Sequence, residues 1–301
     1  MPRRFGRHIR VSLAAFDYTD TVADTVTIDA DPNARVVPTV EFDVRVEAST
    51  PYPTGEIRLY NLARSTLGLI QQEYLDCRLL AGYVGGELDA IYGGSVRRVY
   101  TVSRPPDVIT TLYLGGSWRF RQEVTLSLEE ADDLIPHVLR AFDLMGVGYD
   151  VGRVRGYLAS GMHRQVEAGF NFGPGYVADL VTRLLEPHGF GWALRADGTA
   201  AVLPSDTVDL IEYDTHVLIG SDSGMVGVPE LMVEEGPRVS LDSRVSGVRV
   251  RTLLDTRLTL DRGFVVNSEL VGGSVFRPIS VVHKGTNRGR AFYSVVEGRK
   301  V

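Results

Sequence analysis

Apolar and polar residues alternate along much of the first third of the chain. In residues 36–47 (VVPTVEFDVRVE), Val40, Phe42, Val44 and Val46 fall on one face, while charged or polar residues fall on the other. A period of two is typical of a strand with one buried face, because successive side chains point to opposite sides. The same pattern predicts further strands at 57–60, 77–83, 88–92, 95–102 and 108–116.

Paired glycines separate the later strands of this region. Gly85-Gly86 follows one strand, and Gly93-Gly94 stands between the segments at 88–92 and 95–102. Glycine adopts positive φ at little cost, so we expect a tight turn at each pair. Short strands joined by such turns indicate a β-barrel or β-sandwich.

The pattern changes near Trp118 and becomes helical. A helix beginning at the capping box of Ser127 would carry Pro136 in its interior, at a cost of about 3 kcal/mol. A start at Asp132 or Asp133 places Pro136 in the first turn, where its missing N–H costs nothing. We therefore expect the later start, with Gly146 ending the helix.

A second helix and a hairpin follow. Apolar residues recur with the helical period over 176–185, and Pro187 and Gly189 end the pattern. Residues 191–204 (GWALRADGTAAVLP) place Asp-Gly between two strand-like runs, which is a strong hairpin signal.

Alternation returns in the last third of the chain, in the segments 246–254, 262–270, 276–285 and 289–298. The sequence thus predicts a mainly β protein with an α+β insert, in which two β-barrel domains flank a small middle domain. We place the domains at 1–116, 117–226 and 227–301.

Composition and charge narrow the function. The chain of 301 residues is 44% hydrophobic and 23% charged, which suits a protein with ordinary cores. A net charge of −6 argues against a dedicated nucleic-acid-binding protein. No apolar run approaches the roughly 20 residues of a membrane helix, and residues 1–11 lack the apolar region of a secretory signal. We expect a protein made in the cytoplasm, with the single Cys77 buried.

The sequence contains no catalytic or metal-binding pattern above background. The six histidines are far apart, and adjacent carboxylates such as Glu129-Glu130 and Asp132-Asp133 fit solvated turns and helix starts better than acid–base pairs. We expect no cofactor and no metal. A further interpretation of the alternating aromatic residues is that they line a face that binds carbohydrate or nucleic acid.

Three groups of motifs resemble those of phage baseplate hub proteins, the family of the T4-type hub and the late-control D proteins. In the first β-domain they are GEIRLYNLARST (55–66), LLAGY (79–83) and IYGGSV (91–96). In the middle domain the segment is 172–192, and in the last third the segments are 223–229, 248–255 and 280–294. Thr256 and Asn287 depart from residues frequent in the family. The resemblance covers nearly the whole chain in the family's order.

The resemblance implies a homotrimeric virion protein of the tail baseplate, assembled in the host cytoplasm. Two tube-type barrels per subunit would form a six-barrel ring that matches the sixfold tail tube to the threefold central spike. The implied partners are copies of the same chain, the tail tube or distal tail protein, the spike and other baseplate proteins. DNA would pass through the lumen only as cargo, and we expect part of the acidic charge to line that channel.

The expected contact elements are a helix at about 64–74, capped by Ser65 or Thr66, and a loop at 284–292. The contact residues predicted on them are Leu67, Ile70, Tyr74, Lys284, Asn287, Arg288 and Arg290. Two alternatives stay open from sequence: a peptidoglycan-degrading enzyme of the tail tip, and a carbohydrate- or nucleic-acid-binding β-module.

Overall fold

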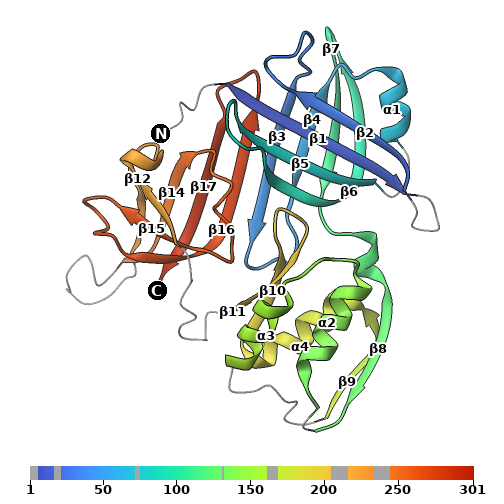
Figure 1. Ribbon diagram of the computed structural model, residues 1–301, viewed down its shortest axis with the longest axis vertical. Helices are drawn as coiled ribbons and strands as arrows, with labels where there is room; N and C mark the ends of the chain where they lie inside the picture. The colour runs from blue at the N-terminus through green and yellow to red at the C-terminus, as the bar shows by residue number, and fades with distance from the viewer. Residues whose placement is uncertain are drawn as a thin grey trace.

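The computed structural model describes residues 6–16, 22–71, 75–130, 132–160, 169–204, 216–233 and 245–301. Over these residues the protein is mainly β with a few helices, which confirms the predicted fold class (Figure 1). None of the described helices is both long and apolar enough to cross a membrane.

The first β-domain consists of two packed layers that share one long strand. Its strands are β1 (Arg7–Phe16), β2 (Val22–Ala30), β3 (Val40–Glu47), β4 (Thr54–Tyr60), β5 (Leu75–Tyr83), β6 (Asp89–Arg104) and β7 (Asp107–Leu114). The first half of β6 pairs with β5 and its second half with β7, so β6 bends from one layer into the other. The turn predicted at Gly93-Gly94 is therefore wrong.

Close packing explains this glycine pair. A Cβ on Gly93 would lie 2.9 Å from the backbone carbon of Asp197 and the nitrogen of Gly198, in the middle domain. Gly93 thus allows two backbones to approach each other inside a strand, and it does not form a turn.

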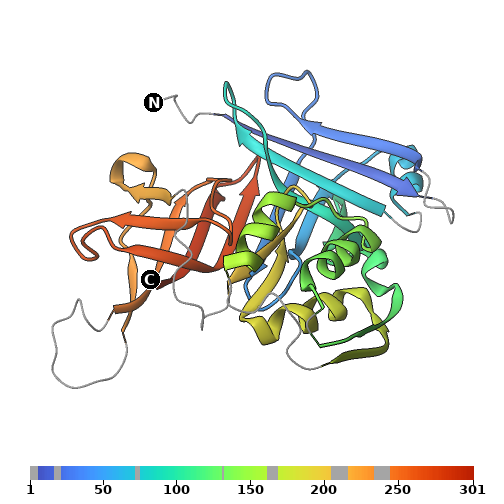
Figure 2. The same ribbon diagram turned by 60° about the horizontal axis from the view of Figure 1, so that its bottom comes forward.

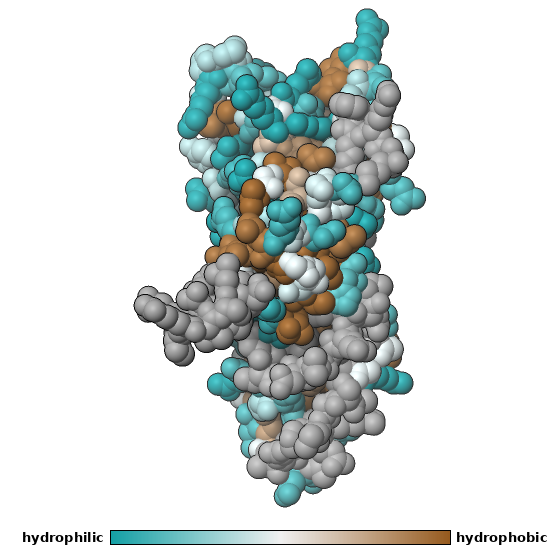
Figure 3. Space-filling view, turned by 90° about the vertical axis from the view of Figure 1, so that its left-hand side faces the viewer, coloured by the Kyte–Doolittle hydropathy of each residue, from teal (hydrophilic) through white to brown (hydrophobic). Residues whose placement is uncertain are grey.

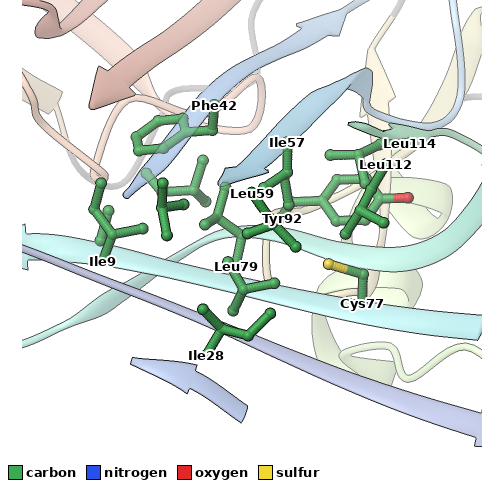
Figure 4. Packing of buried hydrophobic residues seen from close by; sticks show 14 of the residues in the cluster. Ile9, Ile28, Phe42, Ile57, Leu59, Cys77, Leu79, Tyr92, Leu112 and Leu114 are labelled. Atoms are coloured by element: carbon green, nitrogen blue, oxygen red, sulfur yellow. The ribbon is translucent and has the colours of Figure 1, made fainter. Parts of the chain in front are cut away.

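Alternating residues of both layers meet in the first core (Figure 4). Val40, Phe42 and Val44 of β3 point inward, as the period of two predicts. Cys77 is 3% exposed, which confirms its predicted burial.

The short helix α1 (Arg64–Ile70) follows β4. Its N-cap is Ala63, without a side-chain hydrogen bond, so the predicted capping by Ser65 or Thr66 is wrong. The chain already enters the helix before these residues. Ile70 is fully buried in the first core. Tyr74, predicted on the same helix, lies outside the described residues.

The middle domain packs three helices against the β10–β11 hairpin and the two-stranded sheet of β8 and β9. Its elements are η1 (Trp118–Arg121), β8 (Glu123–Leu128), α2 (Leu134–Leu144), α3 (Val151–Ser160), β9 (Phe170–Tyr176), α4 (Val177–Leu185), η2 (Glu186–His188), β10 (Phe190–Leu194) and β11 (Ala200–Pro204). Asp133 caps α2 by accepting a hydrogen bond from Ile135 N, and Gly146 follows its end at φ 64°, as predicted. Helix α3 was not predicted from sequence.

The C-terminal β-domain begins earlier than predicted. Its elements are β12 (His216–Gly220), η3 (Ser221–Ser223), β13 (Glu230–Val233), β14 (Val245–Leu253), β15 (Gly263–Asn267), β16 (Val275–Thr286) and β17 (Phe292–Lys300). Strand β12 pairs in parallel with β15, so residues 216–226 belong to this domain and not to the middle one. Local sequence contains no signal for a pairing over that separation.

The two β-domains are joined edge to edge into a continuous sheet. Strand β16 pairs antiparallel with β3, giving the order β13-β14-β17-β16-β3-β4-β7-β6-β5-β1-β2. The middle domain lies beneath this sheet, with its helices seen in front in Figure 2. It is held there by the Leu194 N to Pro51 O hydrogen bond of 2.7 Å and by the Arg195–Asp261 ion pair of 2.8 Å.

Candidate assembly surface

The described residues contain no group of His, Cys, Asp and Glu arranged to hold a metal ion. The contact closest to a catalytic pair is His283 Nδ1 at 2.8 Å from Ser294 Oγ. Both side chains are buried, and burial lowers the pKa of His283 to about 4. Asp255 N also donates to Ser294 Oγ at 3.0 Å, so this cluster fastens the loop after β14 to the sheet.

The dominant surface feature is one face of the continuous sheet. Residues that lie directly opposite each other across antiparallel strands point to the same side. One such row crosses seven strands, through Leu253, Tyr293, Lys284, Asp43, Glu56, Tyr113 and Arg98. We call the side of the sheet that carries this row the charged face. It crosses both β-domains without interruption.

Cationic and anionic side chains of the charged face form ion pairs with each other. Lys284 Nζ lies 2.8 Å from Asp43 Oδ2, across the strand pair that joins the two β-domains. Side-chain hydrogen bonding to Asp43 raises the pKa of Lys284. Arg58 contacts Glu56, and Arg249 contacts Glu297 at 3.1 Å. These partly exposed pairs add little stability individually, but each places a carboxylate beside a cation of the face.

Asn287 connects the C-terminal loop to the first β-domain. Its Oδ1 accepts a hydrogen bond from Val40 N at 3.0 Å, and its Nδ2 donates to Pro38 O at 2.8 Å. The backbone N of Asn287 donates to Val40 O at 3.3 Å. Three hydrogen bonds therefore extend the β3–β16 ladder by one residue within the same chain.

Arg7 and Phe292 complete this joint, and sequence reasoning missed both. The Arg7 guanidinium donates to the carbonyls of Thr286 (2.8 Å), Gly289, Arg290 (3.2 Å) and Ala291 (3.3 Å). It also lies 5.2 Å from the centre of the Phe292 ring. Phe292 packs edge-on against Phe42 and Tyr83 of the first core. An arginine in a basic terminal run carries no sequence signal for such a role.

The other predicted contact residues fall into two groups. Lys284, Arg288 and Arg290 are exposed, and Arg288 Nη2 donates to Val37 O at 3.0 Å. Leu67 is half-buried, whereas the side chain of Ile70 is fully buried within its own chain. Ile70 therefore supports the core, and a contact with a neighbouring chain remains a prediction for the exposed residues.

Several apolar side chains of the C-terminal domain are exposed. Leu218 is 57% exposed, Val226 42%, Val228 71% and Leu253 37%. The hydrogen bonds from Val226 N to Arg251 O and from Leu253 N to Gly224 O bring the last three segments together. The left-hand side of the molecule in Figure 1, seen face-on in Figure 3, has hydrophobic surface in its middle. We call Leu218, Val226 and Val228 the apolar edge, and count Leu253 with the charged face, to which it points.

Solved structures of tail proteins have a fold similar to that of this chain. The chain superimposes on the tail protein from Neisseria meningitidis MC58 with a TM-score of 0.59 and 10% identity, covering 98% of this chain and 97% of that one. The 43 kDa tail protein of prophage MuSo2 from Shewanella oneidensis gives 0.60 and 8%, with 96% of each chain covered.

A third similar structure is the E. coli c3393 protein, a component of the type VI secretion system with structural similarity to the T4 tail proteins gp27 and gp5. Its TM-score is 0.56 at 10% identity, covering 89% of this chain and 75% of that chain. No protein-family model and no curated protein sequence matches. The chain therefore has the fold of these tail proteins over nearly its whole length.

Proposed function

We propose that this chain is a structural protein of a phage or phage-like tail baseplate, acting as the trimeric hub. The observation that carries the proposal is the joining of two β-domains into one continuous sheet, in a fold similar to tail proteins over 96% or more of the chain in two cases. Because each chain carries two joined β-domains, any ring of such chains contains an even number of β-domains.

In the proposed assembly, three chains contribute six β-domains around a central channel. Six β-domains match a sixfold tail tube on one side, and three chains match a threefold spike on the other. The exposed apolar edge supplies the chemistry for contacts between subunits, because an exposed apolar group gains from being buried there.

The charged face is the proposed lining of the channel. Around the junction of the two β-domains its cations are paired with carboxylates, as in Lys284–Asp43 and Arg249–Glu297, so this part of the face offers no cationic track to phosphates. DNA would pass such a wall without binding it tightly. Asp43, Glu56 and Glu297 on this face supply part of the acidic charge expected to line the channel.

Electron microscopy of the purified protein tests this proposal. The expected image is a ring with a central pore and six β-domains around it. Replacing Leu218 and Val228 together by Asp is expected to prevent ring formation, whereas Val36→Asp, a change at a valine that is 80% exposed in the first β-domain, leaves it intact. The hub role would be contradicted if the wild-type protein forms no rings either alone or together with its tail tube and spike proteins.

A further inference from the structure

A groove lies where the first β-domain meets the middle domain, lined by none of the residues of the apolar edge. This groove has a volume of about 910 Å³, and its walls come from β6, the segment 116–121 and the start of α4. The volume lies near the top of the roughly 300–1,000 Å³ of ligand pockets, so it exceeds what a single small ion needs.

Cationic side chains predominate in this groove. Arg97, Arg98 and Arg121 line it and are exposed, against one carboxylate, Asp179. Among the described residues, no ion pair joins any of these arginines to a carboxylate. A groove with a positive excess is thus formed on a chain whose net charge is −6.

A local irregularity of β6 puts two neighbouring arginines into the groove. Regular alternation would send Arg97 and Arg98 to opposite faces of the sheet. The register of β6 against β7 shifts between Val96 and Arg98, so Arg97 is the extra residue of a β-bulge. The absence of a side chain at Gly115 leaves room for the Arg97 stem, since a Cβ there would lie 3.0 Å from Arg97 Cδ.

Two of the three aromatic side chains that line the groove are packed within the protein. Tyr52 packs against Phe120, with ring centres 6.2 Å apart, and the backbone of Gly116 lies against the Tyr52 ring. Phe120 is 4% exposed and also contacts Trp192. Tyr176, which is 47% exposed, is the remaining ring of the lining. A single-strand-binding channel stacks successive bases on several aromatic side chains, and a single open ring does not provide such a series.

We propose that this groove binds an extended, acidic polypeptide segment of a partner protein. Carboxylates spaced along a peptide would pair with the three arginines, and arginine is suited to bidentate pairing with carboxylates. The groove is large enough for several residues of an extended chain. The groove shares no residue with the apolar edge, and it adjoins the charged face only through Arg98.

Fluorescence anisotropy with labelled octapeptides tests the proposal. Oligoglutamate is expected to bind the wild-type protein more tightly than oligolysine of equal length. The double variant Arg97→Glu/Arg121→Glu is expected to lose at least tenfold in affinity for oligoglutamate. Arg104→Glu is a matched control, because Arg104 is an exposed arginine of the same strand that does not line the groove. It is expected to change affinity by less than twofold.

Three results would overturn the proposal. The first is no oligoglutamate binding by the wild-type protein, and the second is an equal loss in the groove variant and the control. The third is tighter binding of a single-stranded DNA octamer than of oligoglutamate, which would assign the groove to nucleic acid. Thermal melting and the ring assay on each variant separate lost binding from lost folding or assembly.

Discussion

Asn287 allows a direct test of how the two β-domains are joined. In the variant Asn287→Ala, Val40 N–H and Pro38 C=O lose their side-chain partners, while the backbone bond from Asn287 N to Val40 O can persist. A typical hydrogen bond contributes about 1 kcal/mol net, and an unsatisfied buried partner adds to the loss. We therefore expect the free energy of unfolding to fall by about 2–3 kcal/mol.

The comparison with Asn287→Asp separates the two bonds. Aspartate keeps an oxygen that can accept from Val40 N–H, but it places a second oxygen where Asn287 Nδ2 donates to Pro38 O. One bond is then retained and the other becomes a contact between two acceptors. We expect a stability between those of the wild type and the alanine variant, or a value close to that of the alanine variant if the repulsion dominates.

Urea denaturation followed by circular dichroism is the assay, at one fixed chain concentration because association also stabilises the folded chain. Arg288→Ala is the matched control, since the exposed Arg288 side chain donates to Val37 O in the same joint and its backbone bond to Thr286 Oγ1 can persist in the variant. Its expected effect is below about 1 kcal/mol. A loss for Asn287→Ala that is no larger than for the control would refute the role of Asn287 as a connection within the chain.

Further predictions concern the core beneath this joint. Burial lowers the pKa of His283 to about 4, so the unfolded chain takes up this proton first as the pH falls below about 6.5. Above that pH, His283 is neutral in both states and does not reduce the free energy of unfolding. By pH 4 its preferred protonation in the unfolded chain lowers the free energy of unfolding by about 3 kcal/mol. His283→Gln lacks this titration, so the variant is expected to lose less stability than wild type between pH 7.5 and 4; equal losses would contradict the assignment. Gly285→Ala places a Cβ 2.4 Å from Phe42 Cζ, and overpacking of this kind is expected to cost about 1–3 kcal/mol in urea denaturation. An unchanged midpoint would show that the rings move aside freely.

The local sequence pattern was sufficient to predict most individual strands and helices, but it did not predict which strands pair with each other. The alternation in β3 and the Asp133 start of α2 follow from short-range chemistry, and both agree with the sequence. The pairing of β3 with β16 joins residues more than 230 positions apart, and nothing local specifies it. The glycines at 93 and 94 resemble a turn signal in sequence, because the hairpin at Asp197 that requires Gly93 is about 100 residues away.

For the candidate surface, too, the sequence indicated a contact element but not the groups that it contacts. The sequence identified the loop at 284–292 as a contact element, and the structure places Asn287 against Val40 and Pro38 of its own chain. A polar side chain suited to bonding backbone groups has the same sequence signature whether those groups are in the same chain or in another. Arg7 was missed for a related reason: its partners are four backbone carbonyls, which carry no sequence identity.

Oligomeric mass tests the central claim most directly. Light scattering coupled to gel filtration should give three times the chain mass of 33.1 kDa, about 99 kDa, for the protein alone or for its share of a complex with the spike. A trimer that dissociates when Leu218 and Val228 are replaced by Asp agrees with the proposed hub. A protein that stays at 33.1 kDa at all concentrations, with and without the spike, would contradict it.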